Sequence, residues 1–297
     1  MKIQLIKNIT LALSILGLTA CNEDLQQASH SFDAKSTPMT FIVSHPGQTR
    51  ATETNFEPND KIGLYVVSTN APLEIGGNLV NNEALTFDGN NWNSSHALYW
   101  DEGTYNAYAY YPYITKVSSI EDQPFSVSTD QRTTKTSTTL GSYEASDLLF
   151  ATTQGITASA SPIRLNFKHI MSKLTIRLIK GEDFEGEMPT NATVYVHNTV
   201  PTATIDLQAG AATRYQKGNR QSIIARQEDK YLFSAIIVPQ RVENRQPLFE
   251  VEMNGVSYLV ESKFLFKPGT EHLVNIIITN NPEQVKIDIG GEIQGWK

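Results

Sequence analysis

Short runs of alternating or β-branched apolar residues, separated by Gly, Asn, Asp and Pro, most constrain what this chain can fold into. In "KLTIRLI" (173–179), Leu174, Ile176 and Leu178 fall on one side of an extended chain, and the polar residues between them fall on the other. This period of two is that of a strand with one buried face. Because no window of a dozen residues shows a helical stripe, the sequence predicts an all-β fold.

Strands are predicted along most of the chain, and sandwiches are favoured over a single barrel. Asn254-Gly255 separates two of these strands and is the strongest short signal for a hairpin. Only "FKHIMSKL" (167–174) could hold a turn or two of helix. The predicted strands are 40–44, 61–67, 104–113, 147–151, 162–167, 173–179, 192–196, 231–238, 248–253, 256–262 and 272–279.

A small, polar stretch, "TTQGITASASP" (152–162), lies between two strand-dense halves. It predicts two tandem β-sandwich domains, an N-terminal one at 40–155 and a C-terminal one at 156–297. No internal repeat of fixed period is present. The polar, aperiodic residues 21–39 are expected to be a tether that precedes the first domain.

The N-terminus has the pattern of a secretory signal peptide over residues 1–20. Lys2 and Lys7 provide its positive charge, and the apolar run "ITLALSILGLTA" (9–20) follows. This run is too short to cross a bilayer as a permanent helix.

Cys21 is the only cysteine of the 297 residues, so no internal disulfide can form. The sequence Leu18-Thr19-Ala20-Cys21 resembles a bacterial lipobox, in which the cysteine thiol is acylated and the chain is cut before it. The alternative is a chance cysteine inside a plain signal peptide. We expect acyl chains such as palmitate on Cys21 to hold the protein to the outer membrane, since each buried methylene contributes about 0.8 kcal/mol. The following "NED" (22–24) resembles a surface-export signal of some lipoproteins.

Composition and charge argue against one class of function, the binding of nucleic acid. The chain is 40% hydrophobic and 19% charged, as in a soluble globular protein, and its net charge is −7. No basic run is present, which argues against nucleic acid as a partner, because phosphate binding needs clustered positive charge.

Motifs that would indicate catalysis or a metal are absent from the sequence. The six histidines form no HxH or HExxH pair, and the sequence has no GxSxG, GxxxxGK[ST] or GxGxxG motif. The acidic stretch "GEDFEGE" (181–187) lacks the ligand register of a calcium loop and is interpreted as a solvated turn. We therefore expect no enzymatic activity, no cofactor and no metal.

Aromatic residues gather between positions 100 and 113. If exposed, Trp100 and Tyr113, together with Trp92, would form a contact surface for sugar rings or a partner protein. The alternative, which we favour, is that Tyr108 and Tyr110 share one face of a strand and lie in a sandwich core.

Several phrases in order along the chain resemble the fimbrillin family, the lipoprotein-derived pilins of Gram-negative anaerobes. The resemblance covers about 250 residues behind the lipobox. Its phrases are "TRATETNFEPNDKIGLYV" (49–66), "YNAYAYYP" (105–112), "SDLLFA" (146–151), "LNFKHIMSKLTIRL" (165–178), "FKPGTEHLVNIII" (266–278) and the terminal Gly295-Trp296. The resemblance implies two transthyretin-like β-sandwich domains, a role in surface fimbriae and no cofactor.

The resemblance also implies maturation by an arginine-specific protease, and Arg50-Ala51 in "GQTRAT" matches the cleavage position. This Gly/Thr/Gln-rich stretch is of the kind that proteases prefer, although an ordinary surface arginine is the alternative. Cleavage would remove the lipidated leader together with Phe41, Ile42 and Val43, and would expose a groove between strand edges that these three residues had helped to fill.

A strand from the next subunit could fill that groove by donor-strand exchange. The candidate donor is "EQVKIDIGGEIQGWK" (283–297), in which Val285, Ile287 and Ile289 alternate with polar residues. It could equally be the last strand of its own sandwich. Because such a contact is heterologous and does not close, its repetition gives a filament.

The leading hypothesis is a fimbrial subunit precursor that assembles with other fimbrial subunits at the cell surface and serves adhesion to a host or bacterial protein or glycan. One alternative is a lipid-retaining fimbrial anchor or minor subunit. Another is a surface lipoprotein that does not polymerise and binds glycans through Trp92, Trp100 and Tyr113.

Overall fold

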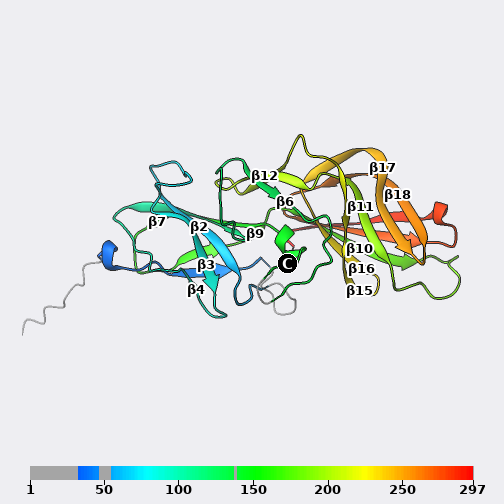
Figure 1. The fold of residues 1–297 in the computed structure, drawn as a ribbon, viewed down its shortest axis with the longest axis horizontal. Helices are drawn as coiled ribbons and strands as arrows, with labels where there is room; N and C mark the ends of the chain where they lie inside the picture. The colour runs from blue at the N-terminus through cyan, green and yellow to red at the C-terminus, as the bar shows by residue number, and fades with distance from the viewer. Residues whose placement is uncertain (1–32, 47–54, 137–138, 297) are drawn as a thin grey trace, which may run out of the picture. The chain divides into compact units, whose positions relative to one another are not determined.

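The structure, a computed structural model, describes residues 33–46, 55–136 and 139–296. Its strands form five sheets, which confirms the predicted all-β sandwich fold (Figure 1). Within these described ranges, no helix is long and apolar enough to cross a membrane. The helical elements found there are the short 3-10 turns η1 (Ala34–Ser36), η2 (Glu144–Ser146) and η3 (Pro282–Gln284).

A six-stranded sheet dominates the first half of the chain, in the order β4-β3-β2-β5-β7-β9. Its strands are β2 (Lys61–Ser68), β3 (Val80–Phe87), β4 (Trp92–Asn93), β5 (Thr104–Tyr111), β7 (Leu149–Thr157) and β9 (Lys168–His169). The middle of this sheet is buried on both faces. On β2, Ile62 and Leu64 belong to a first core, whereas Tyr65 and Val67 belong to a second. Two buried faces explain the nearly continuous apolar sequence of β2.

The preferred interpretation of the aromatic run is confirmed, because Tyr108 and Tyr110 are 5% and 1% exposed on the second-core face of β5. Gly63 of β2 lies opposite Tyr110, and a Cβ atom there would come within 2.4 Å of the tyrosine ring. A glycine is therefore needed at position 63 for the ring to lie across the strand.

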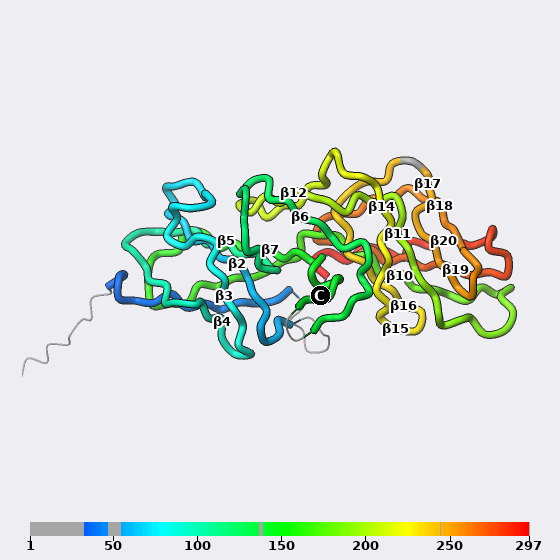
Figure 2. The backbone as a smooth tube through the Cα atoms, in the orientation of Figure 1, coloured from blue at the N-terminus to red at the C-terminus, as the bar shows by residue number. Residues whose placement is uncertain are grey.

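The second half contains two stacked sheets. One has the order β15-β16-β10-β19-β20 and the other β14-β11-β17-β18. In Figures 1 and 2, β17 lies beside β18, and Figure 2 shows β19 beside β20. The strands are β10 (Ser172–Lys180), β11 (Thr193–Thr199), β14 (Gln221–Ile224), β15 (Arg226–Asp229), β16 (Leu232–Ile237), β17 (Gln240–Met253), β18 (Val256–Phe266), β19 (Thr270–Ile278) and β20 (Lys286–Gln294). Leu174 and Ile176 of β10 and Phe249 and Val251 of β17 meet in the second core, as expected of a sandwich.

Strand pairing also joins the two halves. β6 (Gln123–Ser126) pairs with β12 (Thr202–Asp206), which pairs in turn with β13 (Ala211–Arg214). β7 runs through Thr157, so the first part of the small, polar stretch 152–162 is strand. Asp33–Lys297 form one compact unit. The domain boundary between residues 155 and 156 therefore stays a prediction.

Most strand predictions agree with the structure, and the Asn254-Gly255 hairpin is confirmed. Met253 pairs with Val256, and both turn residues have positive φ angles, 50° and 77°. The suggested helical turn at 167–174 is wrong, because β9 and the start of β10 occupy it. β3, β4, β6, β9 and β12 to β15 were not expected.

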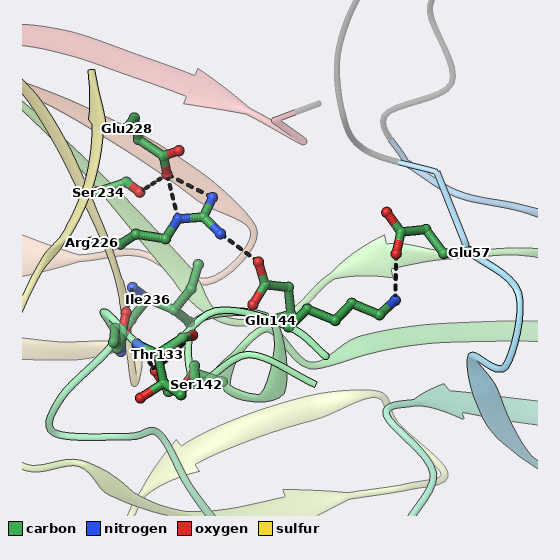
Figure 3. A network of polar contacts seen from close by, with 11 residues as sticks. Glu57, Thr133, Ser142, Glu144, Arg226, Glu228, Ser234 and Ile236 are labelled. Carbon is green, nitrogen blue, oxygen red and sulfur yellow. Dashed lines mark hydrogen bonds and ion pairs between the residues drawn. The ribbon is translucent and has the colours of Figure 1, made fainter. Parts of the chain in front are cut away.

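Buried polar contacts fix the connection between β6 and η2. Gln131 is fully buried, and it both donates to the Ile236 carbonyl and accepts from the Ile236 amide, each at 2.8 Å. Figure 3 shows Arg226 between Glu144 and Glu228, with the Glu228 bond at 2.7 Å. Side chains from the first half thus hold β15 and β16 of the second.

Candidate functional site

Strand β1 (Phe41–Ser44) has a single strand partner in the described part of the chain, β8 (Ile163–Asn166), which runs parallel to it. The Ile163 amide donates to the Thr40 carbonyl at 2.8 Å, and the Phe167 amide donates to the Ser44 carbonyl at 3.0 Å. Removing β1 would therefore leave β8 with an open edge.

Burial along β1 alternates. Phe41 and Val43 are half-buried and pack on the first core, whereas Ile42 is 42% exposed. The expectation that Ile42 helps to fill a groove is wrong, because successive side chains of a strand point to opposite faces. On β8, the side chains of Ile163 and Leu165 are 2% and 0% exposed.

The two ends of the segment that contains Arg50 lie together. The ring centroids of His45 and Phe56 are 5.0 Å apart. Phe56 also makes edge contacts with Trp92 at 4.9 Å, with Tyr111 at 5.4 Å and with Phe167 at 5.6 Å. An aromatic cluster therefore closes this segment at its base.

His169, on β9, contacts a residue just after β1, a residue just before β7 and the C-terminal region. Its Nδ1 lies 2.9 Å from Asp147 Oδ1, and its ring stacks on Trp296 at 4.1 Å and contacts His45 edge-on at 5.9 Å. Burial first, and then the charge of His169, lowers the pKa of His45 to about 4. His45 is therefore neutral at pH 7, as suits its aromatic surroundings.

The candidate donor segment pairs within its own sheet. β20 is an edge strand antiparallel to β19, with Ile287 opposite Ile276 and Ile289 opposite Val274. Val285 and Ile287 pack on the second core, whereas Ile289 is 52% exposed. In the single chain, the segment is the last strand of its sheet. Its role as a donor stays a prediction.

The proposed aromatic contact surface is not continuous. Trp100 is 2% exposed and packs on Tyr105, so its place in an exposed surface is wrong. Trp92 is half-buried and stacks on Phe87 at 5.1 Å. Tyr113 is half-buried, and its amide donates to the Lys61 carbonyl.

Cys21, Arg50 and Ala51 lie outside the described residues. Within the described ranges, no group of three or more His, Cys, Asp or Glu side chains could hold a metal ion. The junction of His169 with Trp296 was not predicted, because 127 positions separate the two residues in the sequence. The histidine and the terminal tryptophan were the only signals that could have suggested it.

Comparison with known proteins identifies the family. A model of the fimbrillin-like family matches residues 49–296. The chain belongs to this family. Its fimbrillin-like sequence is 26% identical over 218 residues to a Bacteroides ovatus protein described as "Putative fimbrium tip subunit Fim1C". That match covers 65% of this chain but only 39% of the relative.

Solved structures share the fimbrillin-like fold. A "putative cell adhesion protein" from Bacteroides ovatus has a TM-score of 0.67 and 19% identity, covering 90% of this chain and 99% of that one. A second one, from Bacteroides uniformis, also has a TM-score of 0.67 and 19% identity, covering 86% and 98%. A fimbrial protein from Bacteroides ovatus has a TM-score of 0.50 and 18% identity, covering 82% and 48%.

Proposed function

We propose that this fimbrillin-like protein is a structural subunit of a surface fimbrium that serves adhesion, without enzymatic activity of its own. It is secreted as a lipoprotein through Cys21, cut after Arg50 and assembled by strand exchange. The family match supports the fimbrial role, and it starts at residue 49, beside the proposed cleavage position.

The observation that carries the processing step is the placement of β1. It is a four-residue strand held by one neighbour, β8, and it precedes a segment whose two ends meet at His45 and Phe56. Phe41 and Val43 are half-buried on the first core, the preceding residues Ala34 and Met39 are buried there, and the Met39 amide donates to the Leu98 carbonyl at 2.7 Å. A cut after Arg50 would leave β1 and the residues before it with only non-covalent contacts to the rest of the fold, and their release would expose β8.

Processing is tested by sequencing the N-terminus of fimbriae extracted from cells that carry the wild-type chain, Arg50→Ala or Arg50→Lys. We expect wild-type fimbriae to begin at Ala51, and both variants to stay uncut and unassembled. Arg50→Lys keeps the charge, so it separates recognition of arginine from a general effect of charge. Polymers of Arg50→Ala that still begin at Cys21 would refute the processing step.

In the proposed strand exchange, β20 is the donor strand. Ile289 and Ile293 are already exposed at 52% and 46%, so this edge strand buries only part of its apolar surface in its own sheet. Pairing with the open edge of β8 in the next subunit would bury more.

Paired cysteines test the donor role, because the cut chain contains none of its own. We expect Ile289→Cys with Arg164→Cys on β8 to give a ladder of disulfide-linked subunits in assembled fimbriae. The matched pair Ile289→Cys with Glu252→Cys, an exposed position on β17, should give none. Fimbriae that form normally without any ladder from the first pair would exclude this donor and acceptor arrangement.

Lipidation is tested separately by labelling cells with radioactive palmitate. The uncut precursor should carry the label, Cys21→Ser should not, and mature fimbriae should have lost it. A label retained in assembled fimbriae would instead assign this protein to the lipid-retaining anchor.

The similarity to Fim1C favours a second candidate position, the tip of the fimbrium. Immunogold labelling distinguishes the two positions. Labels spaced along the shaft indicate a stalk subunit, and a single label at the end indicates a tip subunit.

A further inference from the structure

A hollow of about 680 Å³ opens between β13, the start of β17 and the end of β18. Its size lies within the range of small-molecule sites in proteins. None of its residues belongs to β1, β8 or β20, so an inference about it is independent of the proposed assembly mechanism.

Irregular pairing at the start of β17 shapes this hollow. Val242 lies opposite Phe264 and Gln246 lies opposite Ser262, so β17 uses four residues where β18 uses two. The extra residues of such a bulge leave the ladder and redirect their side chains. Gln240 fixes the strand start, because it accepts from the Val200 amide at 2.9 Å and donates to the Val200 carbonyl at 3.1 Å.

The lining is positively charged, although the chain as a whole has a net charge of −7. Arg214, Arg220 and Arg241 line the hollow, and Glu243 is the one acidic residue among them. The lining therefore carries a net charge of +2, which attracts anions to this place on an acidic protein.

Two of these arginines have no acidic partner in the described parts of the chain. Arg220 Nη1 donates to Gln246 Oε1 at 2.7 Å, and Arg214 Nη2 donates to Gln216 Oε1 at 3.5 Å. Only Arg241 approaches a carboxylate, that of Glu243 at 3.8 Å, and both side chains are well exposed. Neutral amide partners orient a guanidinium without neutralising it, which leaves its remaining N–H groups for a carboxylate, sulfate or phosphate.

The rest of the lining offers an apolar surface and hydrogen-bond acceptors. Leu265 is 39% exposed, and Pro239 and Pro268 also line the hollow, so part of its wall is apolar. The one aromatic lining residue, Phe266, is 1% exposed and offers no free face for stacking. Glu243 and Gln246 provide acceptors for hydroxyl groups.

We propose that this arginine-lined hollow binds an acidic saccharide, whose carboxylate or sulfate group lies between Arg214 and Arg220 and whose apolar sugar face packs on Leu265. Gln246 acts as a positioning residue, because it holds the Arg220 guanidinium. The shared chemistry is an oxyanion on a sugar ring, which either a uronic acid or a sulfate ester can supply.

Isothermal titration calorimetry on the full-length chain in detergent tests this proposal. The probes are a glucuronate-containing disaccharide, a sulfated disaccharide, neutral N-acetyllactosamine, inorganic sulfate and a peptide of residues 181–187, the acidic stretch of a second copy. We expect at least one acidic disaccharide to bind ten times or more tightly than the neutral one, and its affinity to fall as salt is added. The stronger of the two acidic probes identifies the anionic group.

Substitutions of the lining residues test whether binding takes place in this hollow. Arg214→Gln and Arg220→Gln should each weaken binding about tenfold or more, because each removes a charge-assisted hydrogen bond. Arg220→Lys keeps the charge but not the fork and should fall between the wild type and Arg220→Gln. Gln246→Ala should weaken binding about threefold, and Arg177→Gln, an exposed position on β10, should change nothing. Circular dichroism checks that each variant is folded.

Four results would overturn the proposal. The first is equal affinity for the neutral and acidic disaccharides. The second is that inorganic sulfate binds but no saccharide does, and the third is that the peptide binds but no saccharide does. The fourth is acidic-sugar binding that survives both arginine substitutions. Peptide binding alone would indicate a contact between copies of this chain. None of these results bears on whether the chain is cut after Arg50, so the two proposals fail separately.

Discussion

Acidification from pH 7 to pH 5 is expected to destabilise this protein through His45. In the folded chain, burial lowers the pKa of His45 to about 4, whereas the unfolded value is 6.5. Between these values the unfolded state binds a proton that the folded state does not, so stability is present above pH 6.5 and is lost as the pH falls toward 4. The charge of His169 acts with burial, and Asp147 and Asp60 act against both.

The size of this effect follows from the two pKa values. Each pH unit inside the window is worth about 1.4 kcal/mol, so the loss between pH 7 and pH 5 is about 2 kcal/mol. Burial also lowers the pKa of His272, which adds a loss of the same sign. The depressed pKa values of Asp88 and Glu250 act mainly below their ordinary values of 3.8 and 4.5, so they contribute little between pH 7 and pH 5.

Urea unfolding, followed by tryptophan fluorescence at pH 7 and at pH 5, measures the effect. The variant His45→Gln should lose about 2 kcal/mol less between the two pH values than the wild type. The control His96→Gln, at a side chain that is 63% exposed, should behave as the wild type does. If His45→Gln retained the full pH dependence, the assignment to His45 would be refuted.

Two further substitutions test contacts inside the fold. Gly210 has a φ of 64°, and a Cβ there would come within 2.0 Å of the Phe150 ring, so urea unfolding of Gly210→Ala should show a loss of about 2–4 kcal/mol. Gly186→Ala, with a φ of 72° and open space, should lose only about 1 kcal/mol, and equal losses would contradict the steric argument. Lys135→Met leaves the buried Asp60 carboxylate without its ion pair at 2.9 Å. In the same assay at pH 7, the free energy of unfolding should fall by about 2–3 kcal/mol. Unchanged stability would refute the importance of that pair.

The sequence predicts those strands that carry a clear period. In β10, Leu174, Ile176 and Leu178 alternate with polar residues, and each of the three is buried. β13 to β15 were missed because they are short and mostly polar and carry no comparable pattern, whereas β12 does alternate, with Ala203 and Ile205 buried, but over only five residues. The pairing of β6 with β12 was beyond reach, because it joins segments about 80 positions apart whose sequences do not specify each other.

The site was predicted less well than the fold, because its burial and contacts depend on segments that are distant in the sequence. Alternation places Phe41 and Val43 on one face of β1, but it was not used to place Ile42 on the other. Nothing local distinguishes buried Trp100 from half-buried Trp92, because the difference comes from the strands that cover them. Side chains that meet from distant segments, as His169 and Trp296 do, depend on the tertiary fold.

Assembly and ligand binding use separate parts of this chain, and that separation is itself testable. The proposed assembly step depends on release of β1 from β8, whereas the proposed saccharide site depends on arginine side chains that line a hollow beside β13 and β17. Because neither site contains a residue of the other, the free-energy effects of Arg50→Ala and Arg220→Gln should add. The double variant should stay uncut, as Arg50→Ala does, and should bind acidic disaccharide as weakly as Arg220→Gln does. An affinity of uncut Arg50→Ala that differs from that of the cut wild-type chain would instead show that removing β1 reshapes the hollow, which the fixed contacts of Gln240 at its base argue against.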